Sequence, residues 1–405
     1  MQIKDLEDKY LEFILNRCIN FNKSKSLFIS YIKENKQIID ILVKKAREKG
    51  INDIYLEEID LNYQHELLSK LTIDEIKTHQ YFQSDIWDEY AKKDASFLMA
   101  ESYIPHLMDD IAGEKVAFAN FQKRSTKPIY RKKQANYEIP WCIFCLPNEL
   151  WANLIFPNNK NAYEKLYFSI LKACMIDQND PIVNWNNYIE KAKEKVKLLN
   201  DLEIKRLHYT NSLGTDLYVS LIPNTKWLGV GTDKEKDMLV NMPSYEIFTS
   251  PDYHMTEGIV YSSKPLNYNG TLIEDFFLEF KDGKIINYDA KKGKKALHGI
   301  IESDENSCYL GEIALVPKDS PIANMNLTFY ETLFDENASC HLALGDSFVT
   351  VLEEYEKQTK EELFAMGLNQ SKVHVDFMIG TNDLNVDAET KDGIINIFKD
   401  GKFNV

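Results

Sequence analysis

The sequence predicts an α/β domain over residues 1–202, followed by a strand-rich α+β domain over residues 203–405. Three observations support this division. A chain of 405 residues with 44% hydrophobic content is long enough for two or three domains, each with its own buried core. Apolar residues recur at helical spacing in the first half, next to a short strand-like segment. The second half changes to short strand-like segments separated by turn residues.

The α/β prediction for the first domain rests on one helix-to-strand unit. Residues 38–50 carry apolar side chains at helical spacing, with lysine and arginine near the end and Gly50 as the terminating residue. Residues 51–56 then have the composition of a strand. A helix that feeds a strand through a short glycine turn is the repeating unit of α/β layers.

Three further elements are expected in the first domain. Residues 72–113 are predicted to be mostly helical and to carry no chemistry. Residues 141–146 form a continuous apolar run, which is typical of a buried strand. Asp180 before Pro181 is a suitable N-cap for a long helix that runs to about residue 202, where the domain boundary is placed.

The second domain is predicted from a series of short strands. The strand-like segments are residues 206–209, 214–222, 256–261, 276–280 and 285–288. Asp282 and Gly283 separate the last two segments, and an Asp-Gly pair between alternating segments is a strong hairpin signal.

The charge balance argues against a nucleic-acid partner. The formal net charge is -15, whereas binding to a phosphate backbone requires clustered lysine and arginine. The single basic run, residues 122–136 with Tyr130 inside it, is interpreted as a solvated loop and helix start. An anionic surface mildly favours cationic ligands such as free amines.

The sequence also indicates a cytoplasmic protein without a membrane partner. No apolar run of signal-peptide type follows the charged N-terminus, and no segment reaches the roughly eighteen apolar residues of a membrane span. The six cysteines lie in apolar surroundings, which predicts reduced, buried thiols. Cys142 and Cys145 have the spacing of a redox or zinc pair, but they lie in a predicted buried strand and no second pair completes a zinc set.

Two short stretches are candidates for the halves of a metal site. Glu336 and His341 lie on either side of a predicted helix start, and His374 and Asp376 would share one face of a strand because they alternate with apolar residues. Histidines and carboxylates suit a hard or borderline divalent ion. A His-x-Asp pair on an apolar strand is more often a structural hydrogen-bonded pair than a set of ligands, so both interpretations remain open on these residues alone.

Five segments of the second half help to decide between these interpretations: residues 241–252, 270–274, 310–317, 332–345 and 373–380. Together they resemble the thermophilic metalloaminopeptidase family, the group that contains aminopeptidases T and S, and they occur in the family's order and nearly at its spacing. The resemblance is strong over residues 206–405 and faint over residues 136–205. It does not extend to residues 1–135.

The resemblance implies a metal-dependent aminopeptidase that removes N-terminal residues from short peptides or amides. The implied metal ligands are Glu246, Glu312, Glu336, His341, His374 and Asp376. This set implies two divalent ions per chain, of zinc, cobalt, manganese or magnesium, which share a carboxylate and activate a bridging water as the nucleophile. Glu246 is expected to serve as a ligand and as a candidate base. The family further implies an N-terminal domain that covers the metal-bearing domain, and homodimers that enclose the active sites in a cavity.

Two departures from the family pattern leave other functions open. Phe348 replaces a tyrosine that is thought to donate its hydroxyl to the transition state, and Tyr245 stands where the family often has an acid. Tyr245 could supply a hydroxyl instead, or it could be a packed aromatic residue. The alternatives are a specialised hydrolase of one dedicated peptide or amide, an iron-dependent oxygenase on the same fold, and a non-catalytic binding protein that has kept its metal ligands.

Overall fold

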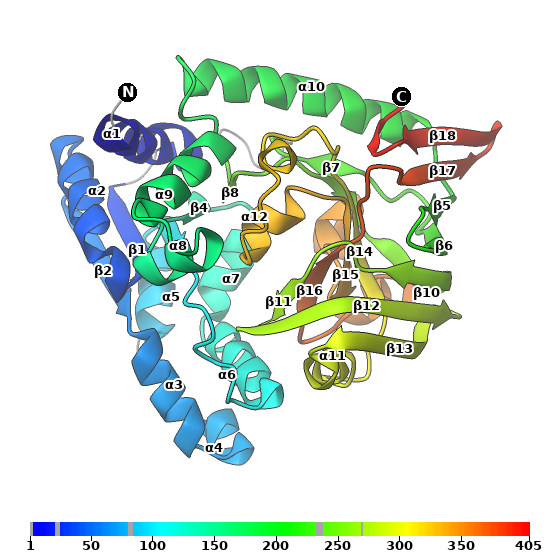
Figure 1. Cartoon of the computed structure of the whole chain (residues 1–405), viewed down its shortest axis with the longest axis horizontal. Coiled ribbons are helices and arrows are strands. Elements are labelled where there is room, and N and C mark those ends of the chain that lie inside the picture. The colour runs from blue at the N-terminus through cyan, green and yellow to red at the C-terminus, as the bar shows by residue number, and fades with distance from the viewer. Residues whose placement is uncertain (1–2, 21–24, 80–83, 232–237, 269) are drawn as a thin grey trace. The chain divides into compact units, whose positions relative to one another are not determined.

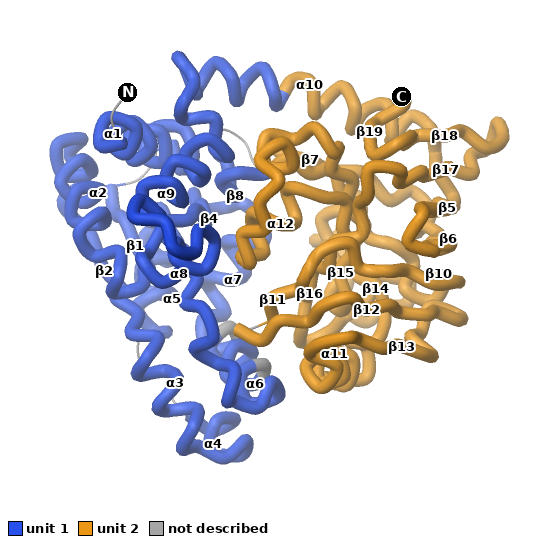
Figure 2. Tube along the Cα trace, in the orientation of Figure 1, with its two compact units in different colours: residues 1–189, 231–244 blue, residues 190–230, 245–405 orange. Residues whose placement is uncertain are grey.

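The computed structural model of the chain describes residues 3–20, 25–79, 84–231, 238–268 and 270–405. They group into two compact units, shown in blue and orange in Figure 2. Unit 1 comprises residues 1–189 and 231–244, and unit 2 comprises residues 190–230 and 245–405. The placement of a domain boundary near residue 202 stays a prediction.

Unit 1 is built on a parallel sheet with the strand order β2-β1-β3-β4-β8 (Figure 1). Its strands are β1 (Ser26–Ile32), β2 (Asp53–Ile59), β3 (Ser96–Glu101), β4 (Trp141–Cys145) and β8 (Asn241–Met242). Every residue of β1 is buried, as expected for a central strand of a parallel sheet. The predicted α/β architecture of the first half is therefore confirmed.

Helices connect these strands. Their bounds are α1 (Ile3–Phe13), α2 (Lys36–Glu48), α3 (Leu61–Lys70), α4 (Ile73–Thr78), α5 (Ser84–Lys92), α6 (Gly113–Ser125), α7 (Pro128–Ala135), α8 (Glu149–Ile155), α9 (Ala162–Ala173) and α10 (Pro181–Asp201). The predicted helix before Gly50 corresponds to α2, and the predicted strand after it to β2. The long helix after Asp180 is also confirmed, because the Asp180 carboxylate accepts a hydrogen bond of 3.1 Å from the Val183 N–H at the start of α10.

Two predictions for unit 1 need correction. The region of residues 72–113 is not mostly helical, because β3 lies within it, between β1 and β4. An apolar run buried on both faces has no alternation that would distinguish a strand from a helix. The basic run lies mainly in α6 and α7 and is only partly solvated. Tyr130 is buried, and the buried Lys127 ammonium lies 3.4 Å from the centre of the Trp87 ring.

The cysteine prediction is confirmed. Cys142 and Cys145 lie in β4, all six cysteines are buried, and none of them forms a disulfide bond. Among the helices of the described residues, none combines the length and the apolar character needed to cross a membrane.

Unit 2 contains two antiparallel sheets in the part of the chain that the structure describes. The larger has the order β11-β12-β10-β6-β5-β17-β18-β19, with β13 also paired to β12, and the smaller has the order β16-β15-β14-β9-β7. The strands are β5 (Arg206–Thr210), β6 (Asp216–Leu221), β7 (Leu228–Gly229), β9 (Ile247–Thr249), β10 (Pro251–Tyr261), β11 (Leu266–Tyr268), β12 (Thr271–Lys281), β13 (Lys284–Lys292), β14 (Leu310–Leu315), β15 (His341–Gly345), β16 (His374–Met378), β17 (Asn385–Thr390), β18 (Gly393–Lys399) and β19 (Lys402–Phe403). The helices are α11 (Lys294–Ile301), α12 (Thr332–Glu336) and α13 (Lys360–Ala365).

The predicted hairpin at Asp282 and Gly283 joins β12 to β13. Both turn residues have positive φ angles, 50° and 77°, as a two-residue hairpin turn requires. A Cβ atom on Gly283 would lie 1.9 Å from the Tyr253 carbonyl oxygen, so only glycine fits at this position.

One hydrophobic core joins the two sheets of unit 2. In the smaller sheet, Ile313 of β14, Leu342 of β15 and Phe377 of β16 contribute to this core. Because side chains alternate along a strand, the residues next to these three present their side chains on the opposite face of the sheet. That opposite face carries the candidate site.

Candidate metal centre

Three neighbouring strands place four of the predicted ligands on the face of the small sheet that lies opposite the core. Glu312 comes from β14, His341 from β15, and His374 and Asp376 from β16. The predicted alternation of His374 and Asp376 on one face of a strand is therefore confirmed. The structure thus brings together residues that are up to 64 positions apart in the sequence, counted from Glu312 to Asp376.

The strand register explains why these side chains can converge. Glu312 and Asp376 are both paired with Ala343 of β15, which lies between them. Alanine has the smallest side chain after glycine, so it leaves space above β15 for the two carboxylates. The small side chain of Ala343 therefore makes room for the carboxylates of Glu312 and Asp376.

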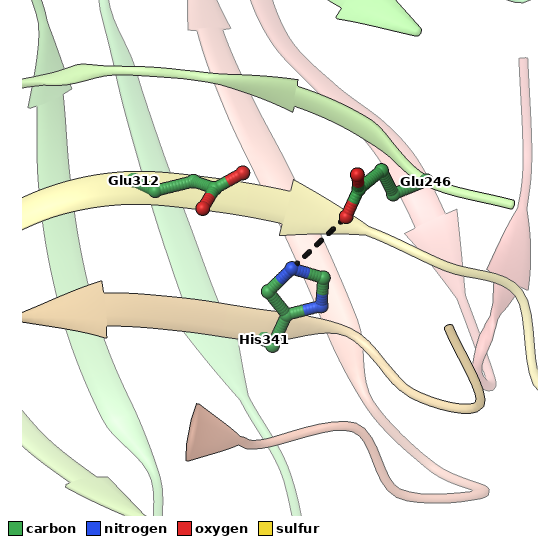
Figure 3. Close-up of side chains that lie close together, drawn as sticks. All are labelled: Glu246, Glu312 and His341. Atoms are coloured by element: carbon green, nitrogen blue, oxygen red, sulfur yellow. Dashed lines mark ion pairs between the residues drawn. The ribbon is translucent and has the colours of Figure 1, made fainter. Parts of the chain in front are cut away.

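The side-chain atoms form two groups that share Glu312. Glu246, just before β9, forms the first group with Glu312 and His341, and the second consists of Glu312, His374 and Asp376. Within each group the ligand atoms lie within 4.8 Å of one another. Figure 3 shows the first group, in which His341 Nε2 lies 3.2 Å from a Glu246 oxygen. His374 Nε2 lies 3.0 Å from Glu312 and 3.3 Å from Asp376.

Backbone carbonyls fix the orientation of both histidine rings. His341 Nδ1 lies 3.1 Å from the carbonyl oxygens of Glu336 and Ser339, and His374 Nδ1 lies 2.7 Å from the carbonyl oxygen of Asp346. A carbonyl can only accept, so Nδ1 carries the proton in each ring and Nε2 is directed to the carboxylates. This is the orientation in which a histidine offers Nε2 to a metal ion.

Burial and crowding of carboxylates shift the pKa values of the cluster in the absence of a metal. Burial raises the pKa of Glu312 to about 7, helped by the charges of Asp376 and Glu246 and opposed by His374. Burial also raises the pKa of Glu336 well above its ordinary value, and the charge of Asp376 adds to this effect.

The histidines and Asp376 shift in the directions that paired charges impose. Burial opposes the charged form of His341, but the hydrogen bond and charge of Glu246 outweigh it and raise its pKa to about 9. Burial would likewise raise the pKa of Asp376, but His374 outweighs it and lowers the value to about 2. Burial would lower the pKa of His374, but the hydrogen bonds and charges of Asp376 and Glu312 outweigh it and raise the value well above the ordinary one. The cluster therefore favours bound cations, here protons on the histidines.

Glu336 lies outside both groups, although the charges of three of their carboxylates raise its pKa. It is the last residue of α12, and its backbone carbonyl faces His341. The predicted helix start between these two residues is wrong, because the helix ends at Glu336 and His341 begins β15. Residues 337–345 begin polar and end apolar, a pattern that fits a helix or a strand. The pairing of β15 with both β14 and β16 makes its residues a strand.

The two residues that depart from the family pattern lie in different surroundings. Phe348 borders the second group, because its ring centre lies 5.1 Å from that of His374 in an edge-on arrangement, and its side chain is 37% exposed. It also contacts Phe248 at a centroid distance of 5.0 Å. Tyr245 is almost completely buried, and its backbone N–H donates to the side-chain oxygen of Asn337.

Asn337 is a site residue that the sequence did not reveal. Its amide accepts from the Tyr245 N–H and donates to the Leu333 carbonyl at 2.8 Å and to a Glu336 oxygen at 3.4 Å. Its own backbone carbonyl accepts from the Ser320 hydroxyl at 3.0 Å. One buried side chain thus joins α12 to the segment that carries Glu246. An asparagine next to a predicted ligand was the only signal in the sequence.

Replacement of Asn337 with alanine should lower the free energy of unfolding by about 2–3 kcal/mol, since several buried backbone groups lose their partners. Urea unfolding of the metal-free protein measures this loss. Asn324→Ala is the matched control, because this exposed amide makes one local contact, to the Asp319 carbonyl, and its loss should cost less than about 0.5 kcal/mol. Equal losses in the two variants would contradict the joining role of Asn337.

The donor set fits divalent cations. Four carboxylates and two imidazoles are gathered where little water reaches them, and such a set is unfavourable unless cations neutralise it. Within the described residues, the buried Oδ1 of Asp376 has no hydrogen-bond partner, although the His374 ring lies 3.3 Å away. Oxygen and nitrogen donors in this mixture suit zinc, cobalt, manganese or magnesium.

Comparison with known proteins identifies the family. The thermophilic metalloprotease (M29) family matches residues 3–403. Aminopeptidase AmpS of Bacillus subtilis (strain 168) is 35% identical over 395 residues, which cover 95% of this chain and 94% of the relative. Aminopeptidase PepS of Streptococcus thermophilus is 34% identical over 98% of both chains. The match includes the first 135 residues, so the prediction that the resemblance stops there is wrong.

Solved structures agree with this result. Wild-type AmpT from Thermus thermophilus superposes with a TM-score of 0.89 at 28% identity, over 100% of both chains. A 2,5-dihydroxypyridine dioxygenase from Pseudomonas putida KT2440 reaches a TM-score of 0.52 at 11% identity, over 100% of this chain and 98% of that one, and this likeness shows the fold alone. Both the sequence match and the fold lead to one conclusion: the chain belongs to the thermophilic metalloprotease family.

Proposed function

We propose that the carboxylate and histidine cluster of unit 2 holds two divalent ions and serves to remove N-terminal residues from short peptides. The chain is a metal-dependent aminopeptidase, as the sequence predicted, because it belongs to a metalloprotease family and its relatives are aminopeptidases. The number of ions, their ligands and the substrate are the parts that we propose.

The single observation that carries the two-ion proposal is the shared position of Glu312. It belongs to both groups of ligand atoms, so its carboxylate could contribute to holding both ions. Glu246 and His341 would complete one ion's ligands, and His374 and Asp376 the other's. Glu336 is the proposed sixth ligand, since its carboxylate is close enough to the others for their charges to raise its pKa. Two divalent ions also match the charge of four carboxylates.

When bound, such ions polarise a substrate carbonyl as Lewis acids and lower the pKa of a water molecule. The chain's own residues supply the remaining functions. The carbonyls of Glu336, Ser339 and Asp346 hold both imidazoles with Nε2 toward the cluster. Glu246, which is 9% exposed, is the carboxylate proposed as both ligand and proton acceptor. The excess of carboxylates favours the free ammonium group of a peptide N-terminus.

Hydrolysis of aminoacyl p-nitroanilides tests this function. We expect the purified protein to cleave a subset of the panel, to lose this activity with a chelator, and to regain it with cobalt or zinc. N-acetylated versions of the cleaved substrates are the matched control and should remain intact, because they lack the free α-amine. Cleavage of the acetylated substrates, or no cleavage of any substrate by protein that retains its ions, would contradict the proposal.

The stabilisation by metal ions should grow as the pH rises. In the metal-free protein, Glu312 has a pKa of about 7 against an ordinary 4.5, and His341 has about 9 against 6.5. A raised pKa gives stability that is complete below the ordinary value and is lost as the pH rises through the folded value. The lowered pKa of Asp376 acts only in acid, where stability is lost as the pH falls below about 4.

We therefore expect the metal-free protein to lose stability between pH 5 and 9, roughly the range these pKa values span. Bound ions replace the protons, so they should remove most of this loss. Differential scanning calorimetry of the metal-loaded and metal-free forms should give a difference in Tm that is larger near the upper end of this range. A difference that shrinks toward high pH would contradict the role of these residues as ligands.

A second candidate is a hydrolase dedicated to one peptide or amide. The observation that favours it is Phe348, whose ring borders His374 and has no hydroxyl to donate. This candidate predicts bound ions without turnover of the general panel. The iron-dependent oxygenase and the non-catalytic binding protein have no comparable observation in their favour.

Assembly and location are also proposed. We propose a homodimer, as the family resemblance implied, and light scattering after size-exclusion chromatography measures it. We also propose a reducing, cytoplasmic location, because none of the six cysteines forms a disulfide bond.

A further inference from the structure

A second candidate binding site lies in unit 2, and its wall contains none of the predicted metal ligands. It is a cavity of about 470 Å³. Residues that precede β15 line it, among them Ser339, together with the turn after β16, which includes Gly380 and Thr381. Lys264 and Lys318 also lie in its wall. A cavity of this size is within the range of small-molecule sites.

The charge of the wall is opposite to that of the chain. The protein has 63 acidic and 48 basic residues, yet the wall contains two lysines and no aspartate or glutamate. Within the described part of the chain, Lys264 forms no ion pair. The Lys318 ammonium donates to the Asn382 carbonyl at 2.9 Å, which leaves two of its three protons for other acceptors.

Three carboxylates that lie close to this wall in the sequence already have partners. Asp319 pairs with Lys402, and Asp383 accepts from the Thr381 hydroxyl and the Ser212 N–H. Asp335 is buried and accepts a hydrogen bond from the Phe329 N–H. Burial raises the pKa of Asp335 to about 6, and the charge of Lys264 opposes this rise. These acids therefore reduce but do not cancel the positive charge of the wall.

Part of the wall is apolar. The accessible apolar side chains of the wall are Leu213, which is 46% exposed, and the partly buried Leu327. The two lysines require a negative group on the ligand, and the apolar part favours a hydrocarbon group next to it. Together they describe a small amphipathic anion.

Ser339 connects this cavity to the metal centre. Its hydroxyl accepts from the Gly380 N–H at 3.0 Å, and its carbonyl oxygen lies 3.1 Å from His341 Nδ1. A Cβ atom on Gly380 would lie 2.6 Å from the Ser339 hydroxyl, so the contact depends on glycine. A ligand in the cavity would therefore touch a residue that orients a predicted ligand.

We propose that this cavity binds a small organic anion that combines one carboxylate with an apolar group, which is the chemistry of an N-blocked amino acid. The carboxylate is held by Lys264 and Lys318, and the apolar group lies against Leu213 and Leu327. This site goes beyond the proposed function, because it requires neither the ions nor a free amine.

Calorimetric titration of the metal-loaded, full-length protein with N-acetyl-L-leucine tests the proposal. The ligand control is N-acetyl-L-leucine amide, which has the same shape without the carboxylate. The protein variants are Lys264→Gln and Lys318→Gln, and the control is Lys295→Gln, which removes the same charge from an exposed position of α11 outside the cavity. We expect the acid to bind, the amide not to bind, and each cavity variant to raise the Kd by about tenfold, the value of one charge-assisted hydrogen bond.

Other results would overturn the site. Equal binding of the acid and the amide would show that the lysines do not recognise the carboxylate. If the acid did not bind, the cavity would not be a site for this class of ligand. Binding that both cavity variants leave unchanged would place the carboxylate elsewhere, for example on the ions. An equal rise in Kd for Lys295→Gln would show that the effect comes from the net charge of the protein and not from the cavity. Each result is independent of peptide hydrolysis, so the proposed function can stand or fall separately.

Discussion

Replacement of Glu312 with glutamine should lower kcat/KM for aminoacyl-amide hydrolysis by on the order of a thousandfold or more, because it removes a ligand from both proposed ions. Glutamine keeps the size of the side chain and one oxygen, but it loses the charge that holds cations. Glu312 is 3% exposed and belongs to both groups of ligand atoms, so no other carboxylate among the described residues occupies its position. Steady-state kinetics with leucine p-nitroanilide measures the effect.

The matched control for Glu312 is Glu389→Gln, an exposed glutamate in β17 of the same unit. It should change kcat/KM by less than about twofold, as expected for a surface substitution away from the site. If Glu312→Gln retained a tenth or more of the activity, the shared carboxylate could not be the centre of the catalytic site.

Replacement of Phe348 with tyrosine should raise kcat by about tenfold to a hundredfold, the range that one positioned transition-state donor supplies. The ring already borders His374 at 5.1 Å and is 37% exposed, so an added hydroxyl would reach the edge of the cluster and not a packed core. Stopped-flow or steady-state assays on the same substrate panel give kcat and KM separately. The gain is expected in kcat, since the hydroxyl acts on the transition state.

Phe348→Leu is the control for this substitution, because it removes the ring without adding a donor. It should not raise kcat. An unchanged kcat in Phe348→Tyr would show that position 348 lies away from the reacting atoms. Turnover that begins only in Phe348→Tyr, with ions bound in both forms, would instead favour the dedicated hydrolase.

Local patterns predicted much of the fold. The hairpin at Asp282 and Gly283, the N-cap at Asp180 and the strand that carries His374 and Asp376 each depend on neighbouring residues only, so their signals are present in short segments. The strand β3 was missed because its run of buried apolar residues has no period. The start of β15 at His341 was missed because pairing with β14 and β16, and not local preference, decides it.

The candidate site was harder to predict from short segments of the sequence than the fold was. Spacing alone identified two half-sites, and a structural hydrogen-bonded pair was the more common interpretation of His374 and Asp376. Glu312 and Glu246 entered only through the family resemblance, because each lies alone among apolar or small residues. The register that places Glu312 and Asp376 on either side of Ala343 is a long-range property, which no short segment encodes. Asn337 was missed for the same reason, since its partners lie in α12 and next to Glu246.

The central claim is that Glu312 lies between two divalent ions, and anomalous X-ray diffraction from a crystal of the cobalt-loaded protein tests it most directly. We expect two peaks a few ångströms apart, one beside Glu246 and His341 and the other beside His374 and Asp376, with the Glu312 carboxylate in contact with both. A single peak, or peaks that do not contact Glu312, would contradict the claim.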